Sequence, residues 1–128
     1  MAVKEAGVQA AKDVWLEHPL FVPAREQPAV AARLAEMVSA YSGWHWVAAA
    51  NPERVLDPPA AQQLSTISAP TLIVVGERDL PDFLAIAAML EQHIPNGRKV
   101  VMPGVGHMSN MENPEGFNQI VLSFLVGQ

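Results

Sequence analysis

The C-terminal part of the chain alternates two kinds of apolar pattern. Residues 71–75 (TLIVV) form an unbroken apolar run rich in β-branched residues, which is typical of a strand buried on both faces of a parallel sheet. Asp82 can cap a helix after this run, and residues 98–102 (RKVVM) predict a second short strand. A last helix begins near Pro114, and its apolar face holds Phe117, Ile120, Val121, Phe124 and Leu125. Strand, helix, strand and helix in this order predict a βαβ unit with a covering helix, and so an α/β fold.

The first part of the chain predicts helices and no strand. Residues 28–41 carry one apolar face on an alanine-rich helix, formed by Val30, Leu34, Met37 and Tyr41. Residues 44–50 (WHWVAAA) are a second apolar patch that predicts a short helix. Residues 53–68 are rich in proline, which excludes a central strand there and indicates a linker. Two strands are few for a covered parallel sheet, because such sheets commonly have about 4–6.

Composition limits the classes of partner. The chain has 128 residues, is 50% hydrophobic and only 16% charged, and so predicts a folded protein rather than a disordered one. Its net charge is −5 and its eight Lys and Arg residues form no basic stripe, whereas nucleic acids and anionic membrane surfaces require clustered positive charge. No apolar run approaches the roughly 20 residues of a membrane span. We therefore expect neither a nucleic-acid nor a membrane partner.

Metal and cofactor chemistry also lack a sequence signal. The chain has no cysteine, and its four histidines show no metal-ligand spacing, so we expect no metal site. No part of the sequence implies an organic cofactor either. The N-terminus lacks the apolar segment of a secretory signal, and a cytoplasmic protein is therefore the default expectation.

Two polar residues follow the two predicted strands. Asp79 comes four residues after Val75. His107 comes five residues after Met102, in a loop with Gly104 and Gly106. Ligands bind open α/β sheets beyond the carboxyl ends of the strands, and adjacent parallel strands bring both loops to one edge. An Asp there can orient a His, whose second nitrogen then acts as a general base. Asp79 in a turn or His107 in a solvated loop would each be unremarkable alone, but the pair predicts a catalytic site.

These two segments resemble the C-terminal end of the α/β-hydrolase fold, in its esterase, lactonase and haloperoxidase-like branch. Residues 70–79 (PTLIVVGERD) are similar to the family's strand and acid turn, and residues 103–118 (PGVGHMSNMENPEGFN) to its histidine loop and final helix. The resemblance implies that Asp79 is the acid and His107 the base of a catalytic triad. It also implies that residues 1–65 are a helical cap segment with its linker and that residues 66–128 are the C-terminal half of the core.

The family's nucleophile is missing from this sequence. Its Gly-x-Ser-x-Gly elbow should precede the cap, and none of the six serines has glycine on both sides at two positions' distance. We therefore expect a truncated member of the family that lacks the oxyanion hole and is inactive alone. In an intact relative, a serine nucleophile would hydrolyse a small acyl substrate such as an ester or lactone. An Asp nucleophile, as in dehalogenase-like relatives, remains an alternative.

Three further residues are candidates for substrate contact. Trp44 and Trp46 would line the substrate face of a cap, although aromatic side chains equally well pack a cap against its core. Met108 would flank the site beside His107, or would serve as an adaptable filler of the core. Neither alternative is decided by the sequence.

A second function, of another class, follows from the expected shortage of strands. The strand at residues 71–75 would have an unpaired edge, and such edges recruit other chains. The chain would then be a non-catalytic binding or assembly module, forming a homo-oligomer or docking onto a separate N-terminal half.

Overall fold

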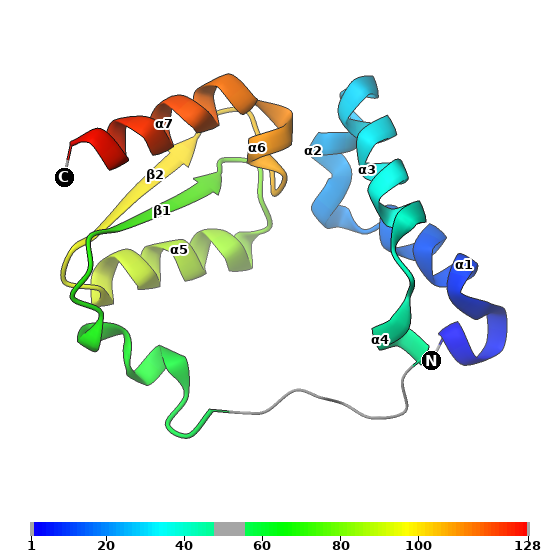
Figure 1. The fold of residues 1–128 in the computed structure, drawn as a ribbon, viewed down its shortest axis with the longest axis horizontal. Coiled ribbons are helices and arrows are strands. Elements are labelled where there is room, and N and C mark those ends of the chain that lie inside the picture. The colour runs from blue at the N-terminus through cyan, green and yellow to red at the C-terminus, as the bar shows by residue number, and fades with distance from the viewer. Residues whose placement is uncertain (1, 48–55, 128) are drawn as a thin grey trace.

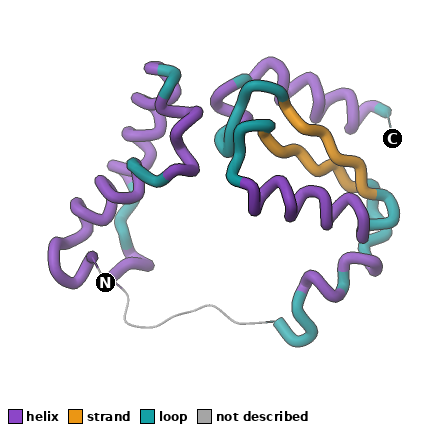
Figure 2. Tube along the Cα trace, turned by 180° about the vertical axis from the view of Figure 1, so that it is seen from behind, coloured by secondary structure: helices purple, strands orange, loops and turns teal. Residues whose placement is uncertain are grey.

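The computed structural model describes residues 2–47 and 56–127, in two regions that lie side by side (Figures 1 and 2). We call residues 2–47 the helical region and residues 56–127 the sheet region. The helical region contains α1 (Ala2–Leu16), η1 (Pro19–Phe21), α2 (Val22–Arg25), α3 (Pro28–Ala40) and α4 (Trp44–Val47). The sheet region contains η2 (Ala60–Gln62), η3 (Leu64–Thr66), β1 (Thr71–Gly76), α5 (Pro81–His93), β2 (Gly97–Met102), α6 (Ser109–Glu112) and α7 (Pro114–Val126).

The two strands pair in parallel, which confirms the predicted βαβ unit. The register places Thr71 opposite Gly97 and Gly76 opposite Met102, so both strands end at the same edge of the sheet. Within the described residues the sheet has these two strands, in the order β1-β2. The α/β fold expected from the sequence is therefore confirmed.

Helices lie along both faces of the sheet (Figure 1). On the α5 face, Ile73 and Val75 pack with Ala87 in a buried cluster that Leu84 and Leu90 flank. The α7 face is looser, because Leu72 and Val74 are only half-buried. Burial of the first strand on both faces is thus complete on one side only.

Two details of the sequence interpretation were wrong. Leu125 was expected on the buried face of the last helix but is 61% exposed, and α7 has no buried residue among those described. Asp82 was expected to cap the middle helix, but the N-cap position belongs to Leu80 and Asp82 lies inside the first turn. There its charge still complements the helix dipole.

The helical region has its own apolar core. Phe21, Ala24, Leu34 and Val38 are buried together, where η1, α2 and α3 meet. On the face predicted for α3, Leu34 is buried as expected, while Met37 is 46% exposed. α4 confirms a helix at the second apolar patch as far as residue 47, and residues 48–50 and 53–55 of the patch and the linker lie outside the described residues.

The two regions meet where α2 lies beside α6, at the end of the sheet where both strands finish (Figure 1). Pro23 of α2 packs so closely on Gly106 that a Cβ atom on Gly106 would lie 2.6 Å from the Pro23 Cγ atom. Beside this contact, the two terminal guanidinium nitrogens of Arg78 donate to the Glu26 carboxylate, at 2.7 and 2.8 Å. These hydrogen bonds lower the pKa of Glu26 below its ordinary value of 4.5. The helical region is thus held over the loop that contains His107, while the proposed boundary at residues 65 and 66 stays a prediction.

Across residues 2–47 and 56–127, no helix combines the length and the apolar character needed to cross a membrane.

Candidate active site

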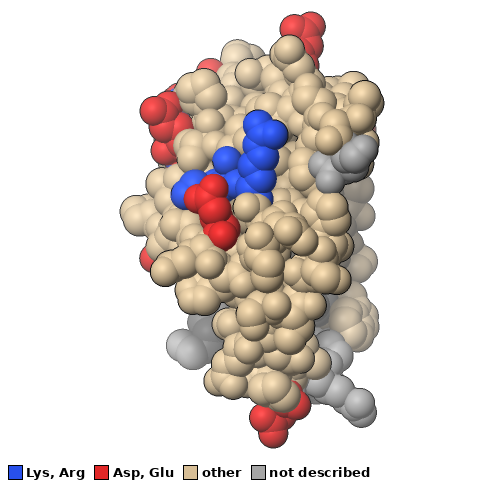
Figure 3. All heavy atoms as spheres, turned by 90° about the vertical axis from the view of Figure 1, so that its left-hand side faces the viewer, with Lys and Arg blue, Asp and Glu red and all other residues tan. Residues whose placement is uncertain are grey.

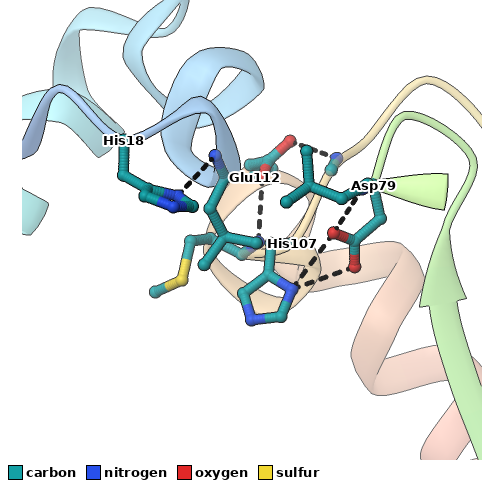
Figure 4. Close-up of polar contacts among 8 residues, drawn as sticks. His18, Asp79, His107 and Glu112 are labelled. Carbon is teal, nitrogen blue, oxygen red and sulfur yellow. Dashed lines mark hydrogen bonds and ion pairs between the residues drawn. The ribbon is translucent and has the colours of Figure 1, made fainter. Parts of the chain in front are cut away.

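Asp79 and His107 lie together at the end of the sheet. Asp79 follows β1 by three residues and His107 follows β2 by five, so the parallel register brings them to the same edge. The His107 Nδ1 atom is 2.9 Å from Asp79 Oδ2 and 3.2 Å from Asp79 Oδ1 (Figure 4). Two residues that are 28 positions apart in the sequence are therefore in direct hydrogen-bond contact.

The surroundings of Asp79 and His107 determine which nitrogen of the imidazole carries the proton. The Asp79 side chain is 6% exposed, and its Oδ1 atom also accepts the backbone N–H of Leu80 at 2.8 Å. A carboxylate can only accept hydrogen bonds, so the contact places a proton on His107 Nδ1 and leaves Nε2 as the acceptor when the ring is neutral. Nε2 points away from Asp79 (Figure 4), and the Phe83 ring lies against the imidazole with 4.5 Å between ring centroids.

Glu112 holds the loop that carries His107. One of its carboxylate oxygens accepts the Gly106 N–H at 2.7 Å, and the other accepts the Met108 N–H at 3.1 Å (Figure 4). Glu112 is 7% exposed, so these are buried or half-buried charge-assisted bonds on both sides of His107. Sequence reasoning missed this role of Glu112. The cap belongs to Asn113, whose side chain accepts the Gly116 N–H at 2.9 Å.

Two glycines let the loop approach its neighbours. A Cβ atom on Gly76 would overlap the backbone oxygens of Val105 and Gly106, so a larger residue there would displace the histidine loop. Gly106 in turn lies under Pro23, as described above. The close packing of strand end, loop and α2 therefore depends on the absence of side chains at both positions.

A cavity of about 400 Å³ opens between the helical region and His107. Met108 lines this cavity and also packs against the apolar core of the helical region. Trp46 also lines the cavity, whereas Trp44 is 58% exposed and lies outside the lining. The complete lining is Trp15, Leu20, Phe21, Leu34, Met37, Val38, Tyr41, Trp46, His107 and Met108.

A smaller cavity of about 180 Å³ lies on the other side of His107, between β1 and α5. Its lining includes Asp79, Ser109 and apolar side chains such as Phe83 and Ile86. Ile86 is 45% exposed. His107 thus lines two cavities, one facing the helical region and one facing β1 and α5.

Within the described ranges, no three His, Asp or Glu side chains gather closely enough to hold a metal ion. The Asp79 and Glu112 carboxylates instead accept hydrogen bonds from His107 and from the backbone.

Sequence comparison finds hydrolases. No family model matches the chain. A 2-hydroxy-6-oxononadienedioate/2-hydroxy-6-oxononatrienedioate hydrolase from Pseudomonas putida is 39% identical over 77 residues, which cover 60% of this chain and 26% of the relative. The 3-oxoadipate enol-lactonase 1 of Acinetobacter baylyi is 36% identical over 64 residues, covering 50% of this chain and 24% of the relative.

Structural comparison extends the likeness to almost the whole chain. MenH from S. aureus superposes with a TM-score of 0.71 over 98% of this chain, at 24% identity. Est816, described as an N-acyl homoserine lactone degrading enzyme, superposes with a TM-score of 0.70 over 96% of this chain, at 30% identity. The chain spans 48% and 49% of these two structures and about a quarter of the curated relatives. Sequence and fold together show that the chain is similar to α/β-hydrolases and has the architecture of a C-terminal portion of that fold.

Proposed function

We propose that this chain supplies the acid–base half of an acyl-hydrolase site. The observation that carries the proposal is the contact of His107 Nδ1 with the nearly buried Asp79 carboxylate, beside an apolar cavity. His107 Nε2 would take the proton of an attacking hydroxyl group and later pass it to the leaving group. Asp79 would hold the imidazole in the required tautomer and stabilise the imidazolium that forms.

The nucleophile would come from outside this sequence. A serine elbow would be deprotonated by His107 directly, whereas an aspartate nucleophile would require His107 to activate the water that cleaves the ester intermediate. Both variants use Nε2 in the same place. The geometry of His107 and Asp79 therefore serves either nucleophile.

The substrate would be a small carbonyl compound. The relatives of this chain include an enol-lactonase, a methyl ester esterase and an N-acyl homoserine lactone degrading enzyme. The cavity volume of about 400 Å³ lies in the range of roughly 300–1,000 Å³ that small-molecule sites occupy. Met108 and Trp46 would contact the acyl group, and no metal or organic cofactor would take part.

A complementation assay tests the proposal. The 128-residue chain is mixed or fused with the half of Est816 that the superposition leaves uncovered, and hydrolysis of p-nitrophenyl acetate is measured. We expect activity that falls by about 10³-fold or more with His107→Ala. Equal activity of the His107→Ala variant would overturn the assignment of the base.

Fluorophosphonate labelling of the unaltered chain, detected by intact mass, tests where the nucleophile is. We expect no adduct. A stoichiometric adduct that disappears in His107→Ala would show a nucleophile inside the chain. Because Ser109 lines the smaller cavity together with His107, Ser109→Ala is the variant that would then locate it.

A second candidate function is assembly through β1. One edge of Thr71–Gly76 pairs with no strand of the described residues, and an apolar groove lies beside the strand. Both favour pairing with a strand of another chain, either a second copy or the complementary half of the fold. Sedimentation velocity over a hundredfold range of concentration measures self-association. A monomer at every concentration would exclude the second copy as the partner.

A further inference from the structure

We propose that the cavity between the helical region and His107 accepts an uncharged, apolar acyl group and discriminates against acyl groups that end in a carboxylate. The inference rests on the proposed function in one respect, because it takes His107 to mark the end where the reacting carbonyl lies. It concerns the other end of the ligand, which the helical region surrounds.

The lining of the cavity carries almost no charge. Its ten residues include no Lys, Arg, Asp or Glu. Apart from His107 and Tyr41, the other eight are leucine, valine, methionine, phenylalanine and tryptophan side chains. Leu34 and Val38 form its buried wall, and Met37 lies nearer its open side at 46% exposure. A ligand group in this space exchanges water for apolar side chains.

The basic side chains that the structure describes next to the sheet region already have partners. Arg25 donates to the Leu16 carbonyl and forms an ion pair with Glu17 at 3.1 Å. Arg78 is held by Glu26 through two hydrogen bonds.

The remaining described basic side chains lie elsewhere or are also occupied. Lys12 donates to the Ser39 carbonyl at 2.7 Å, and Arg33 pairs with Glu36 at 2.6 Å. Arg98 and Lys99 belong to the first half of β2, at the opposite end of the sheet from His107. Figure 3 shows basic side chains gathered in one patch, with acidic ones against them, on the side of the molecule where both strands begin. None of these cations lines the cavity.

Negative charge lies on the His107 side of the cavity. The side chain of Asp79 is 6% exposed, and Glu112 as a whole residue is 7% exposed. A ligand carboxylate would thus leave water for an apolar space that offers no described cation, and it would feel repulsion from two buried anions. A methyl group in the same position meets neither cost.

Two probes of equal length test the proposal. Hexanamide and adipamic acid share a six-carbon amide and differ in ending with a methyl group or a carboxylate, and neither needs a nucleophile to bind. Trp15 and Trp46 line the cavity, so tryptophan fluorescence of the 128-residue chain can follow both titrations at pH 7. We expect hexanamide to bind at least about tenfold more tightly. Equal or tighter binding of adipamic acid, or no binding of either probe, would overturn the proposal.

A charge introduced into the lining provides the matched variant. Met37→Lys places a cation at a half-exposed lining position, and Met37→Gln is its neutral control. We expect Met37→Lys to bind adipamic acid severalfold more tightly relative to hexanamide, and Met37→Gln to leave the ratio unchanged. An unchanged ratio in Met37→Lys would count against the cavity as the binding site. If complementation fails to give His107-dependent hydrolysis while hexanamide still binds, the catalytic proposal is refuted and the binding proposal stands.

Discussion

Replacing Glu112 tests whether one buried carboxylate holds the loop that carries His107. Hydrogen bonds to a charged group contribute about 1.5–3 kcal/mol, and a buried N–H left without an acceptor costs about 1–3 kcal/mol. Glu112→Gln keeps one acceptor oxygen but turns an N–H₂ group toward the backbone N–H of either Gly106 or Met108. We expect the free energy of unfolding to fall by about 1–3 kcal/mol in Glu112→Gln. Glu112→Ala removes both acceptors and should cost about 2–5 kcal/mol.

Urea unfolding followed by circular dichroism measures these changes, and Glu77→Gln is the matched control. The Glu77 carboxylate also accepts a backbone N–H, that of Gly104 at 2.8 Å, but this bond is exposed to water. Its loss should therefore cost no more than about 1 kcal/mol. If Glu112→Gln is as stable as Glu77→Gln, burial does not strengthen the two hydrogen bonds of Glu112, and its carboxylate does not hold the loop that carries His107.

Two further predictions concern the contact between the regions. Gly106→Ala should destabilise the chain by about 1–3 kcal/mol in the same urea assay, because its Cβ atom would lie 2.6 Å from the Pro23 ring. An unchanged urea midpoint would contradict the close packing of Pro23 on Gly106. The hydrogen bonds from Arg78 lower the pKa of Glu26 from 4.5, so the pair stabilises the folded state above that pH and the contribution is lost as the pH falls through the lowered pKa. The difference in urea midpoint between the unaltered chain and Glu26→Gln should therefore be present at pH 7 and shrink below pH 4.5. A difference that grows in acid would show that the ion pair does not stabilise the folded state in this way.

The local elements were largely predictable because their signals are local. A run of β-branched residues at 71–75 and a proline at the first turn of α3 or α7 depend on the backbone preferences of a few neighbours. Predictions failed where the outcome depended on distant residues. Leu125 has helical spacing with Phe117, but its side chain remains exposed because the sheet of two strands does not cover it. Asp82 is not the N-cap of α5, because this helix begins directly after Leu80.

The sequence by itself determined the chemistry of the candidate pair. Asp79 and His107 each follow a strand by a few residues, and parallel strands must end at one edge, so their proximity follows from local pattern and topology alone. The roles of Glu112 and the apolar cavity were decided only by the tertiary structure. A carboxylate near the histidine in sequence can face water or the backbone, and a lining assembled from α1, α3, α4 and the histidine loop exists only once these segments pack together. Burial, which sets the strength of hydrogen bonds and the cost of charge, is a property of the folded chain as a whole.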